Sequence, residues 1–434
     1  MGPMKNQGHK EWATGNARIA LLLALALLFG AGLLPSARAG TKGSSQSEEP
    51  ATVLPVLRIA LGPLGFHPPS LFYLASRPSE LTLNFADPTH LLFTFRIDSL
   101  IPRGSNPKAH QDGQIICADL IDLNTRKVVR QAHWTMQDHQ RYLWALRDGQ
   151  FLVREGNVLY QTGRTLQLVP WDSAPEPLML VEVSPNRQFV AVERAEPADP
   201  ASLTPTVDLL GDSLDRPARV LIEVYRAASH AALLRILAPR PVDLPLVNDG
   251  FVEPAEGKNS HRWLLRRIEV TPAASGQAAP TIDLSTLFTL DSICAPSVLP
   301  LSSTVLLAGC AGDGLDHRMI AVNLNGHPLW QQWWQSRYVW HTIAYAEQGN
   351  RFALGSLLTN ASYVSSSMIS AQNLTGQIVG VFDVRSGRLL LARMAQPVVS
   401  AGQNFALSAN GLRFALLRNH AIEVYSLAAT EPPR

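Results

Sequence analysis

The sequence predicts an all-β protein built as a single β-propeller, with seven four-stranded blades as the preferred count and six or eight as the alternatives. Short β-rich runs bounded by Asn, Gly and Ser recur along the 434 residues, which is typical of repeated small sheets. No segment has the long amphipathic helical pattern that a parallel α/β fold requires between its strands. So many short strands would expose many unpaired sheet edges, and a closed ring of blades leaves only short, protected ones.

The first 39 residues have the pattern of a cleaved signal peptide. Three basic residues precede an unbroken apolar run of 16 residues at 19–34, and Ala37-Arg38-Ala39 is a small-x-small cleavage signal. The run is short for a membrane span of about 20 residues. The interpretation is cleavage after Ala39 and a secreted or periplasmic protein, with an uncleaved anchor as the alternative.

The charge balance argues against two classes of partner. The leader carries four basic residues and one acidic residue, so its removal changes the formal net charge from +2 to −1. A near-neutral chain without a basic stripe gives no electrostatic case for nucleic acid or for an anionic membrane surface. We expect a flexible leader at 40–52, the propeller at 53–428 and a C-terminal tail at 429–434.

The propeller segment divides into repeating units. Strands are expected, in order, at 56–61, 81–85, 91–97, 115–123, 128–129, 142–146, 151–153, 157–160, 178–183, 189–192, 220–225, 263–265, 352–354, 378–384, 389–391, 404–408, 413–417 and 421–427, with a further unit at 292–330. One apolar residue marks the second strand of each unit: Leu92, Phe151, Phe189, Trp263, Val305, Phe352 and Phe414. The fourth unit, centred on Trp263, has the weakest pattern.

The clearest repeat, Gly376–Leu427, is also expected to close the ring. Its last three strands lack a fourth partner, and the N-terminal strand Val56–Leu61 is predicted to supply it. The segment Ile222–Tyr225 closely echoes Ile422–Tyr425 within this repeat.

Three units resemble the WD40-like and quinoprotein-like propeller families. Val381–Leu389 is similar to the "strand, Asp, x, x, Thr/Ser-Gly-Lys/Arg" element of quinoprotein-type repeats, and Ala321–Trp330 and Leu120–Val128 are looser copies. No Gly-His…Trp-Asp pair is present, and neither are the vicinal cysteines and calcium ligands of a quinone-dependent dehydrogenase. The resemblance therefore implies a fold and no catalytic, cofactor-binding or metal-binding residue.

Two of the three cysteines flank a predicted hairpin. Cys294 and Cys310 each lie eight residues from Ser302, so a register centred on Ser302 would set them directly opposite each other. Opposed residues can approach within disulfide range, and an exported protein meets oxidising conditions. The sequence leaves two possibilities, a disulfide or two buried thiols on neighbouring strands. Cys117 is interpreted as a small core residue.

One stretch is strongly enriched in aromatic residues: Trp330, Trp333, Trp334, Tyr338 and Trp340. It is either a platform for a sugar ring or a peptide, or the packing between neighbouring blades. Gly211-Asp212-Ser213-Leu214 matches the GDSL hydrolase motif but lacks a downstream Asp-x-x-His to activate the serine. The segment 312–317 is interpreted as a tight turn, because its few oxygen ligands do not suffice for calcium.

Long insertions are predicted between the second and third strands of several units, at Asp98–Gln114, Arg194–Arg219, Thr271–Pro280 and Leu358–Gln377. Alternate connections of an antiparallel blade emerge on one face of the ring, and functional residues tend to lie on such loops. We therefore expect a non-enzymatic module that binds a protein or glycan through this face. The alternative is a hydrolase or lyase with its site at the central channel.

Overall fold

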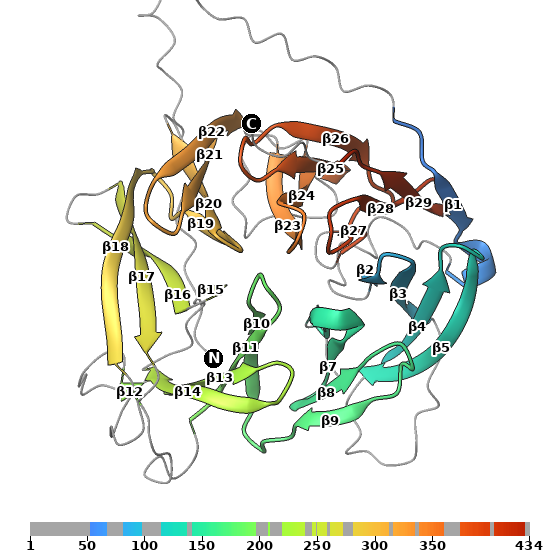
Figure 1. Ribbon diagram of the computed structural model, residues 1–434, viewed down its shortest axis with the longest axis horizontal. Helices are drawn as coiled ribbons and strands as arrows, with labels where there is room; N and C mark the ends of the chain where they lie inside the picture. Colours follow the sequence, from blue (N-terminus) through green and yellow to red (C-terminus); the bar gives the residue numbers. More distant parts are fainter. Residues whose placement is uncertain are drawn as a thin grey trace, which may run out of the picture. The chain divides into compact units, whose positions relative to one another are not determined.

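A computed structural model describes residues 53–66, 81–97, 114–136, 141–196, 207–208, 219–238, 245–248, 250–257, 261–271, 281–311, 316–334, 338–359, 374–399 and 403–429. Seven antiparallel sheets form a ring, which confirms the seven-bladed β-propeller (Figure 1). The helical elements within these residues are two short 3-10 turns, η1 at Gly62–Leu64 and η2 at Arg147–Gly149. No helix of the described residues is long and apolar enough to span a membrane.

Blades 1 to 3 follow the chain from the first strand, beside the channel, to the last. Blade 1 contains β2 (Leu81–Asp87), β3 (His90–Ile97), β4 (Gln114–Asp122) and β5 (Lys127–Met136). Blade 2 contains β6 (Leu143–Ala145), β7 (Phe151–Glu155), β8 (Val158–Thr162) and β9 (Val169–Asp172). Blade 3 contains β10 (Leu178–Val183), β11 (Phe189–Ala195), β13 (Val220–Arg226) and β14 (Ala231–Ala238), with the two-residue β12 (Val207–Asp208) parallel to β14.

Blades 4 to 6 repeat the order. Blade 4 contains β15 (Leu246–Val247), β16 (Gly250–Glu256), β17 (Arg262–Thr271) and β18 (Thr281–Asp291). Blade 5 contains β19 (Ser297–Leu301), β20 (Thr304–Ala311), β21 (Asp316–Asn323) and β22 (Pro328–Trp334). Blade 6 contains β23 (Tyr338–Ala346), β24 (Arg351–Thr359), β25 (Leu374–Asp383) and β26 (Leu389–Met394).

Blade 7 joins the two ends of the chain, as the sequence predicted. It contains β27 (Phe405–Leu407), β28 (Arg413–Arg418) and β29 (Ala421–Ser426), and its fourth strand is β1 (Leu57–Ala60). The pairing is antiparallel, with Leu57 opposite Val424 and Ala60 opposite Ala421. Figure 1 shows β1, in blue, lying along the outer side of β29.

The core is a series of apolar layers between neighbouring blades. The layer between blades 7 and 1, for example, contains Ile59, Leu83, Phe93 and Ile422, all nearly or fully buried. Burial of apolar surface at each junction stabilises the ring by roughly 25 cal/mol per Å² removed from water. Because each layer needs both of its blades, the ring positions the first strands around the channel as one unit.

The prediction for blade 4 was wrong by one strand. Trp263 lies in β17, the third strand, and the buried apolar residue of the second strand is Phe251 in β16. The strand β16 was not predicted because it contains Gly250 and Pro254, and glycine and proline are uncommon inside strands. The insertion assigned to this unit, Thr271–Pro280, consequently joins the third strand to the fourth.

Candidate functional site

A central channel runs between the first strands of all seven blades. The cavity has a volume of about 370 Å³ and is lined by residues of β2, β6, β10, β15, β19, β23 and β27 or of the segments directly flanking them. Its polar lining includes Asn84, Arg141, Glu182, Arg187 and Tyr345. Pockets of about 300–1,000 Å³ are typical of small-molecule sites, so the channel is large enough to bind a ligand.

The turns that join first to second strands form one face of the ring, here called the turn face; they lie between β2 and β3, β6 and β7, β10 and β11, β15 and β16, β19 and β20, β23 and β24, and β27 and β28. On this face the turns of blades 2 to 5 are linked in succession. The Nε of Arg147 donates to the carbonyl of Asn186 at 2.9 Å. The backbone N–H of Asn186 donates to the Oδ1 of Asn248 at 3.0 Å, and the Nδ2 of Asn248 donates to the Oγ of Ser302 at 3.1 Å.

The remaining blades continue this chain of contacts. The backbone N–H of Gln348 in blade 6 donates to the carbonyl of Ala409 in blade 7 at 2.9 Å. The Nη1 of Arg413 in blade 7 donates to the carbonyl of Pro88 in blade 1 at 2.8 Å. These five bonds therefore connect most of the neighbouring blades at the turn face.

Three charged side chains meet across the channel at the turn face. The Nε of Arg147 in blade 2 lies 3.9 Å from the Oε2 of Glu347 in the blade 6 turn. Blades 2 and 6 are three places apart in a ring of seven, so this ion pair crosses the ring instead of joining neighbours. Arg187 in blade 3 also attracts the Glu347 carboxylate. The triad Arg147–Glu347–Arg187 therefore spans the channel at this face.

Burial dominates the electrostatics of the triad. Desolvation raises the pKa of Glu347 although Arg187 and Arg147 both oppose the shift, and it lowers the pKa of Arg187. The Oε2 of Glu347 is buried and has no hydrogen-bond partner among the described residues. An unsatisfied buried carboxylate oxygen is costly, and the attraction of the two arginines offsets part of that cost.

A second charged pair lies within the channel. Arg141, just before β6, donates from its Nε to the carbonyl of Leu143 at 3.3 Å, and its guanidinium lies 5.5 Å from the ring centre of Trp144. The surrounding protein lowers the pKa of Arg141, and Glu182 in β10 counteracts that shift. Arg141 is an exposed residue, and it lines the cavity between the first strands.

Two acids lie at or beside the channel, and both interact with arginines. Glu182 lines the cavity, and Glu347 lies in the turn between β23 and β24. Within the described part of the chain, no group of three or more His, Cys, Asp or Glu residues could hold a metal ion. The sequence did not predict Glu182 or Glu347 as site residues. The pattern that could have indicated them is a charged residue in or just after the first strand of a unit.

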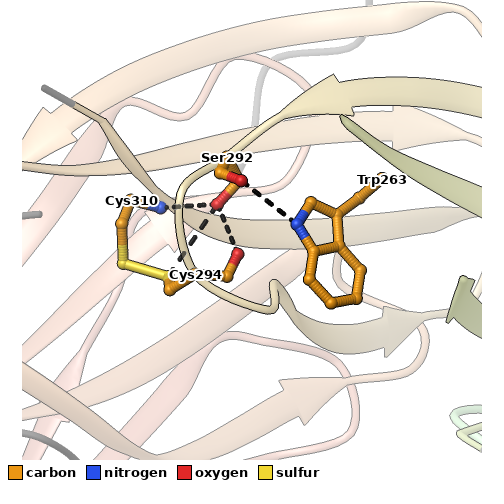
Figure 2. The surroundings of a disulfide bond; sticks show 4 residues. All are labelled: Trp263, Ser292, Cys294 and Cys310. Atoms are coloured by element: carbon orange, nitrogen blue, oxygen red, sulfur yellow. Dashed lines mark hydrogen bonds between the residues drawn. A yellow bond between two sulfur atoms is a disulfide. The ribbon is translucent and has the colours of Figure 1, made fainter. Parts of the chain in front are cut away.

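The disulfide lies where blade 4 meets blade 5. The sulfur atoms of Cys294 and Cys310 are 2.07 Å apart and their Cα atoms 5.5 Å apart. Figure 2 shows Ser292 beside this bond: its Oγ accepts from the backbone N–H of Cys310 at 2.9 Å and donates to the carbonyl of Cys294 at 2.7 Å. The Nε1 of Trp263 donates to the carbonyl of Ser292 at 3.1 Å.

The predicted hairpin register was wrong by half a residue. Leu301 pairs with Thr304, so the turn consists of Ser302 and Ser303, and Cys294 lies before β19 instead of within it. Leu301 is fully buried and belongs to the strand, which shortens the expected three-residue turn to two. Cys117, the third cysteine, is buried, and desolvation raises its pKa to about 12, so it is not a reactive thiolate.

The described part of the aromatic stretch separates into two environments. Trp330 is half-buried, stacks parallel to Phe352 with ring centres 6.3 Å apart, and donates from its Nε1 to the carbonyl of Val384 at 2.7 Å. Trp333 is 56% exposed, with the guanidinium of Arg318 5.7 Å from its ring centre. Trp330 thus joins blade 5 to blade 6. The side chains of Trp334, Tyr338 and Trp340 lie outside the described residues, and so does the GDSL-like segment 211–214.

Three of the four predicted insertions do lie between second and third strands. They belong to blades 1, 3 and 6, at 98–113, 196–219 and 360–373, and their interiors lie largely outside the described residues. The strand ends that these connections leave and enter lie on the face opposite the first turns, here called the insertion face. The segment 272–280, by contrast, follows β17 and precedes β18, and the strand ends that flank it lie on the turn face. The disulfide lies on the insertion face, because Cys310 is near the end of a second strand.

Comparison with known proteins finds similarity of fold only. No protein-family model and no curated protein matches the sequence. A chain of the mitotic checkpoint complex is similar over 92% of this chain and 99% of its own length, with a TM-score of 0.42 and 7% identity. The β-propeller domain of Cps50 (Swd1) from Myceliophteria thermophila matches 81% of this chain and 98% of its own length, with a TM-score of 0.39 and 10% identity.

A peptidase shares the architecture as well. The acylaminoacyl peptidase of Pyrococcus horikoshii is similar over 77% of this chain, with a TM-score of 0.44 and 7% identity, and this chain spans 49% of that enzyme. The expected propeller architecture is confirmed by the ring of seven sheets itself. Because interaction modules and enzymes share this architecture, the likeness does not indicate an activity.

Proposed function

We propose that this chain is an exported binding module whose protein partner docks on the insertion face. Export rests on the leader sequence at 1–39, with its basic residues, apolar run and Ala-x-Ala site. A rigid scaffold that presents long loops on one side is a common design for recognition.

The difference between the two faces carries this proposal. On the turn face, five hydrogen bonds link the turns of successive blades, and the Arg147–Glu347–Arg187 triad spans the channel. On the insertion face, blades 1, 3 and 6 have connections of 16, 24 and 14 residues between their second and third strands. The chain therefore adds surface on one face and fixes the other.

The insertion of blade 3 is anchored at its base. Arg194, 2% exposed, donates to the Oδ2 of Asp172 at 2.7 Å and to the carbonyl of Glu176 at 2.8 Å. Arg219 at the other end forms an ion pair with Glu196 at 3.8 Å. A loop replacement must therefore retain these residues. Removal of 197–218 also deletes β12 from the edge of blade 3, so thermal unfolding of the variant must first show that the propeller is intact.

The test replaces 197–218 and 360–373 with short turns and compares the partners that the variant and the full chain capture by cross-linking. The matched control replaces 272–280 on the turn face. We expect the double replacement to lose the captured protein and the control to retain it. Equal capture by all three proteins would contradict the proposal, and capture of glycans without protein would assign the face to glycan recognition instead.

The alternative, a hydrolase or lyase at the channel, would need Glu182 or Glu347 as its acid or base. Activity that survives both loop replacements but is lost in Glu182→Gln would favour that alternative. The pairing of both acids with arginines supports the binding module in preference to the enzyme.

A further inference from the structure

We infer that the central channel binds a small monocarboxylate with an apolar body, and that the guanidinium group of Arg141 holds the carboxylate. This site is separate from the protein partner proposed for the insertion face. The cavity of about 370 Å³ lies within the range of small-molecule sites. Arg141 lines it and comes just before β6, whose other end leads into the turn face. The residue therefore lies toward the insertion-face end of the channel.

The guanidinium group of Arg141 is held in position by two contacts. Its Nε donates to the carbonyl of Leu143 at 3.3 Å, and the group lies over the indole ring of Trp144, 5.5 Å from the ring centre. The face of an indole ring attracts a cation, so both contacts favour the same placement. A group that is already placed in the free protein loses less conformational freedom when a ligand binds.

The two Nη groups of Arg141 are available to a ligand. Neither has a hydrogen-bond or ion-pair partner among the described residues, and Arg141 is an exposed residue of the cavity wall. Parallel N–H groups of a guanidinium match the two oxygens of a carboxylate. Such charge-assisted hydrogen bonds are stronger than those to a neutral amide, so the group favours a carboxylate.

The charge balance of the channel favours one negative charge in the ligand. Among the described lining residues, Arg141 and Arg187 are the basic groups and Glu182 is the acidic group, which leaves a surplus of one positive charge. The adjoining pair Arg147–Glu347, 3.9 Å apart, does not change this surplus. A monocarboxylate neutralises the channel, whereas an ammonium ligand adds to the positive charge and is repelled.

The remaining wall fits an apolar ligand body. Half-buried apolar side chains from blades 3, 4, 5 and 6 line the same cavity: Val183, Pro245, Val298 and Ile343. Covering the exposed part of such side chains with an apolar group is favourable. We therefore expect the ligand body to be a short alkyl chain or a single aromatic ring.

The experiment titrates the full-length protein calorimetrically with benzoate and hexanoate. Benzamide and hexanamide are the neutral counterparts, hexylamine is the cationic one, and phosphate and sulfate test for a site that takes inorganic anions. We expect at least one carboxylate to bind and its amide to bind at least about tenfold more weakly. Hexylamine, phosphate and sulfate should bind more weakly than the carboxylate.

Substitutions then test the role of Arg141. Arg141→Gln should weaken carboxylate binding by about tenfold or more. Arg141→Lys should weaken it less, because it retains the charge and loses the paired N–H groups. The matched control is Arg130→Gln, which changes the net charge equally at an exposed position of the outer strand β5 and should leave binding unchanged. Glu182→Gln should strengthen binding, because it raises the positive surplus of the channel.

Each of five results would overturn the inference. These are no binding of either carboxylate at millimolar concentration, equal binding of acid and amide, tighter binding of phosphate or sulfate than of the carboxylates, equal effects of Arg141→Gln and Arg130→Gln, and unchanged or weaker binding in Glu182→Gln. If Arg141→Gln does not fold, the comparison of acid with amide and the Glu182→Gln result decide. Loss of the protein partner from the insertion face has no bearing on these outcomes, because the titrations use the protein alone.

Discussion

The third strands of blades 3 and 7 contain the same four residues, Ile-Glu-Val-Tyr, and the structure gives them the same internal chemistry. The hydroxyl of Tyr225 in β13 donates to the Oε2 of Glu223 at 2.7 Å, and the hydroxyl of Tyr425 in β29 donates to the Oε2 of Glu423 at 2.6 Å. Burial, followed by this hydrogen bond, raises the pKa of both tyrosines. Each hydroxyl therefore stays protonated and remains a donor.

The first turns of these two blades are also built alike. The Oγ of Ser184 donates to the Oδ1 of Asn186 at 2.7 Å and accepts from the backbone N–H of Phe189 at 3.0 Å. In blade 7 the Oγ of Ser408 donates to the Oδ1 of Asn410 at 2.8 Å and accepts from the backbone N–H of Arg413 at 2.9 Å.

The two blades differ in their fourth strand. Blade 3 uses β14, which follows β13 directly, and Arg235 lies opposite Glu223 with 2.8 Å from Nε to Oε1. Blade 7 uses β1 from the other end of the chain, and Arg58 occupies the same position opposite Glu423, but at 3.9 Å. The closing strand thus reproduces the residue type and register of its counterpart and forms a looser ion pair. We conclude that closure depends on apolar packing more than on charge.

The largest effect is expected from truncating the apolar residue of each fourth strand. Ile59 lies opposite Ile422 and Ile236 lies opposite Ile222, and both are buried. Ile59→Ala and Ile236→Ala should each lower the free energy of unfolding by about 2–5 kcal/mol, because each leaves a cavity. Urea denaturation measures both losses. If Ile59→Ala costs less than about 1 kcal/mol while Ile236→Ala costs about 2–5 kcal/mol, the strand β1 does not stabilise the ring.

Removing the tyrosine hydroxyls should have the next largest effect. Tyr225→Phe and Tyr425→Phe each delete a hydrogen bond to a carboxylate and leave one buried acceptor oxygen with fewer partners. The expected loss is about 1.5–3 kcal/mol for each, similar in the two blades because the two bonds have similar lengths. Thermal unfolding of the pair tests this, and a difference of more than about 1.5 kcal/mol would break the equivalence of the blades.

These two blades also explain why the fold could be predicted from the sequence. Their repeated segments are local, so one stretch of chain contains the strands and turns that define a blade. Ring closure followed from the same reasoning, because the last unit had three strands and the first apolar segment had no partner. The prediction for blade 4 was wrong at Gly250 and Pro254. Pairing with β17 stabilises this strand, although its residue composition does not favour one.

The channel could not be predicted in the same way. Arg141, Glu182 and Glu347 are far apart in the sequence, and each resembles an ordinary charged residue near a turn. They meet because the ring brings first strands of separate blades to one axis, and the sequence contains no local signal of that proximity. The same holds for the hairpin register at Leu301, which depends on its burial between blades 5 and 6.

A smaller effect is expected from the turn serines. Ser184 and Ser408 are 1% and 0% exposed, and each hydroxyl both donates and accepts within its turn. Ser184→Ala and Ser408→Ala should each cost about 1–2 kcal/mol, since one backbone N–H loses its acceptor. Urea unfolding again provides the comparison. The backbone after the asparagine is left-handed in both turns, with φ values of 57° at Arg187 and 69° at Gly411, and only blade 7 has there the glycine that this conformation favours.

The arginines should have the smallest effect and the clearest difference. Arg235 is 34% exposed and close to Glu223, whereas Arg58 is 56% exposed and farther from Glu423. After solvent screening, Arg235→Met should cost up to about 1 kcal/mol and Arg58→Met less than about 0.5 kcal/mol. The Arg235 effect should shrink as salt is raised, because the Debye length shortens. Equal, salt-sensitive losses in both variants would show instead that the ends of the chain are held together by the Arg58 ion pair, and that Ile59 is only one of two necessary contacts.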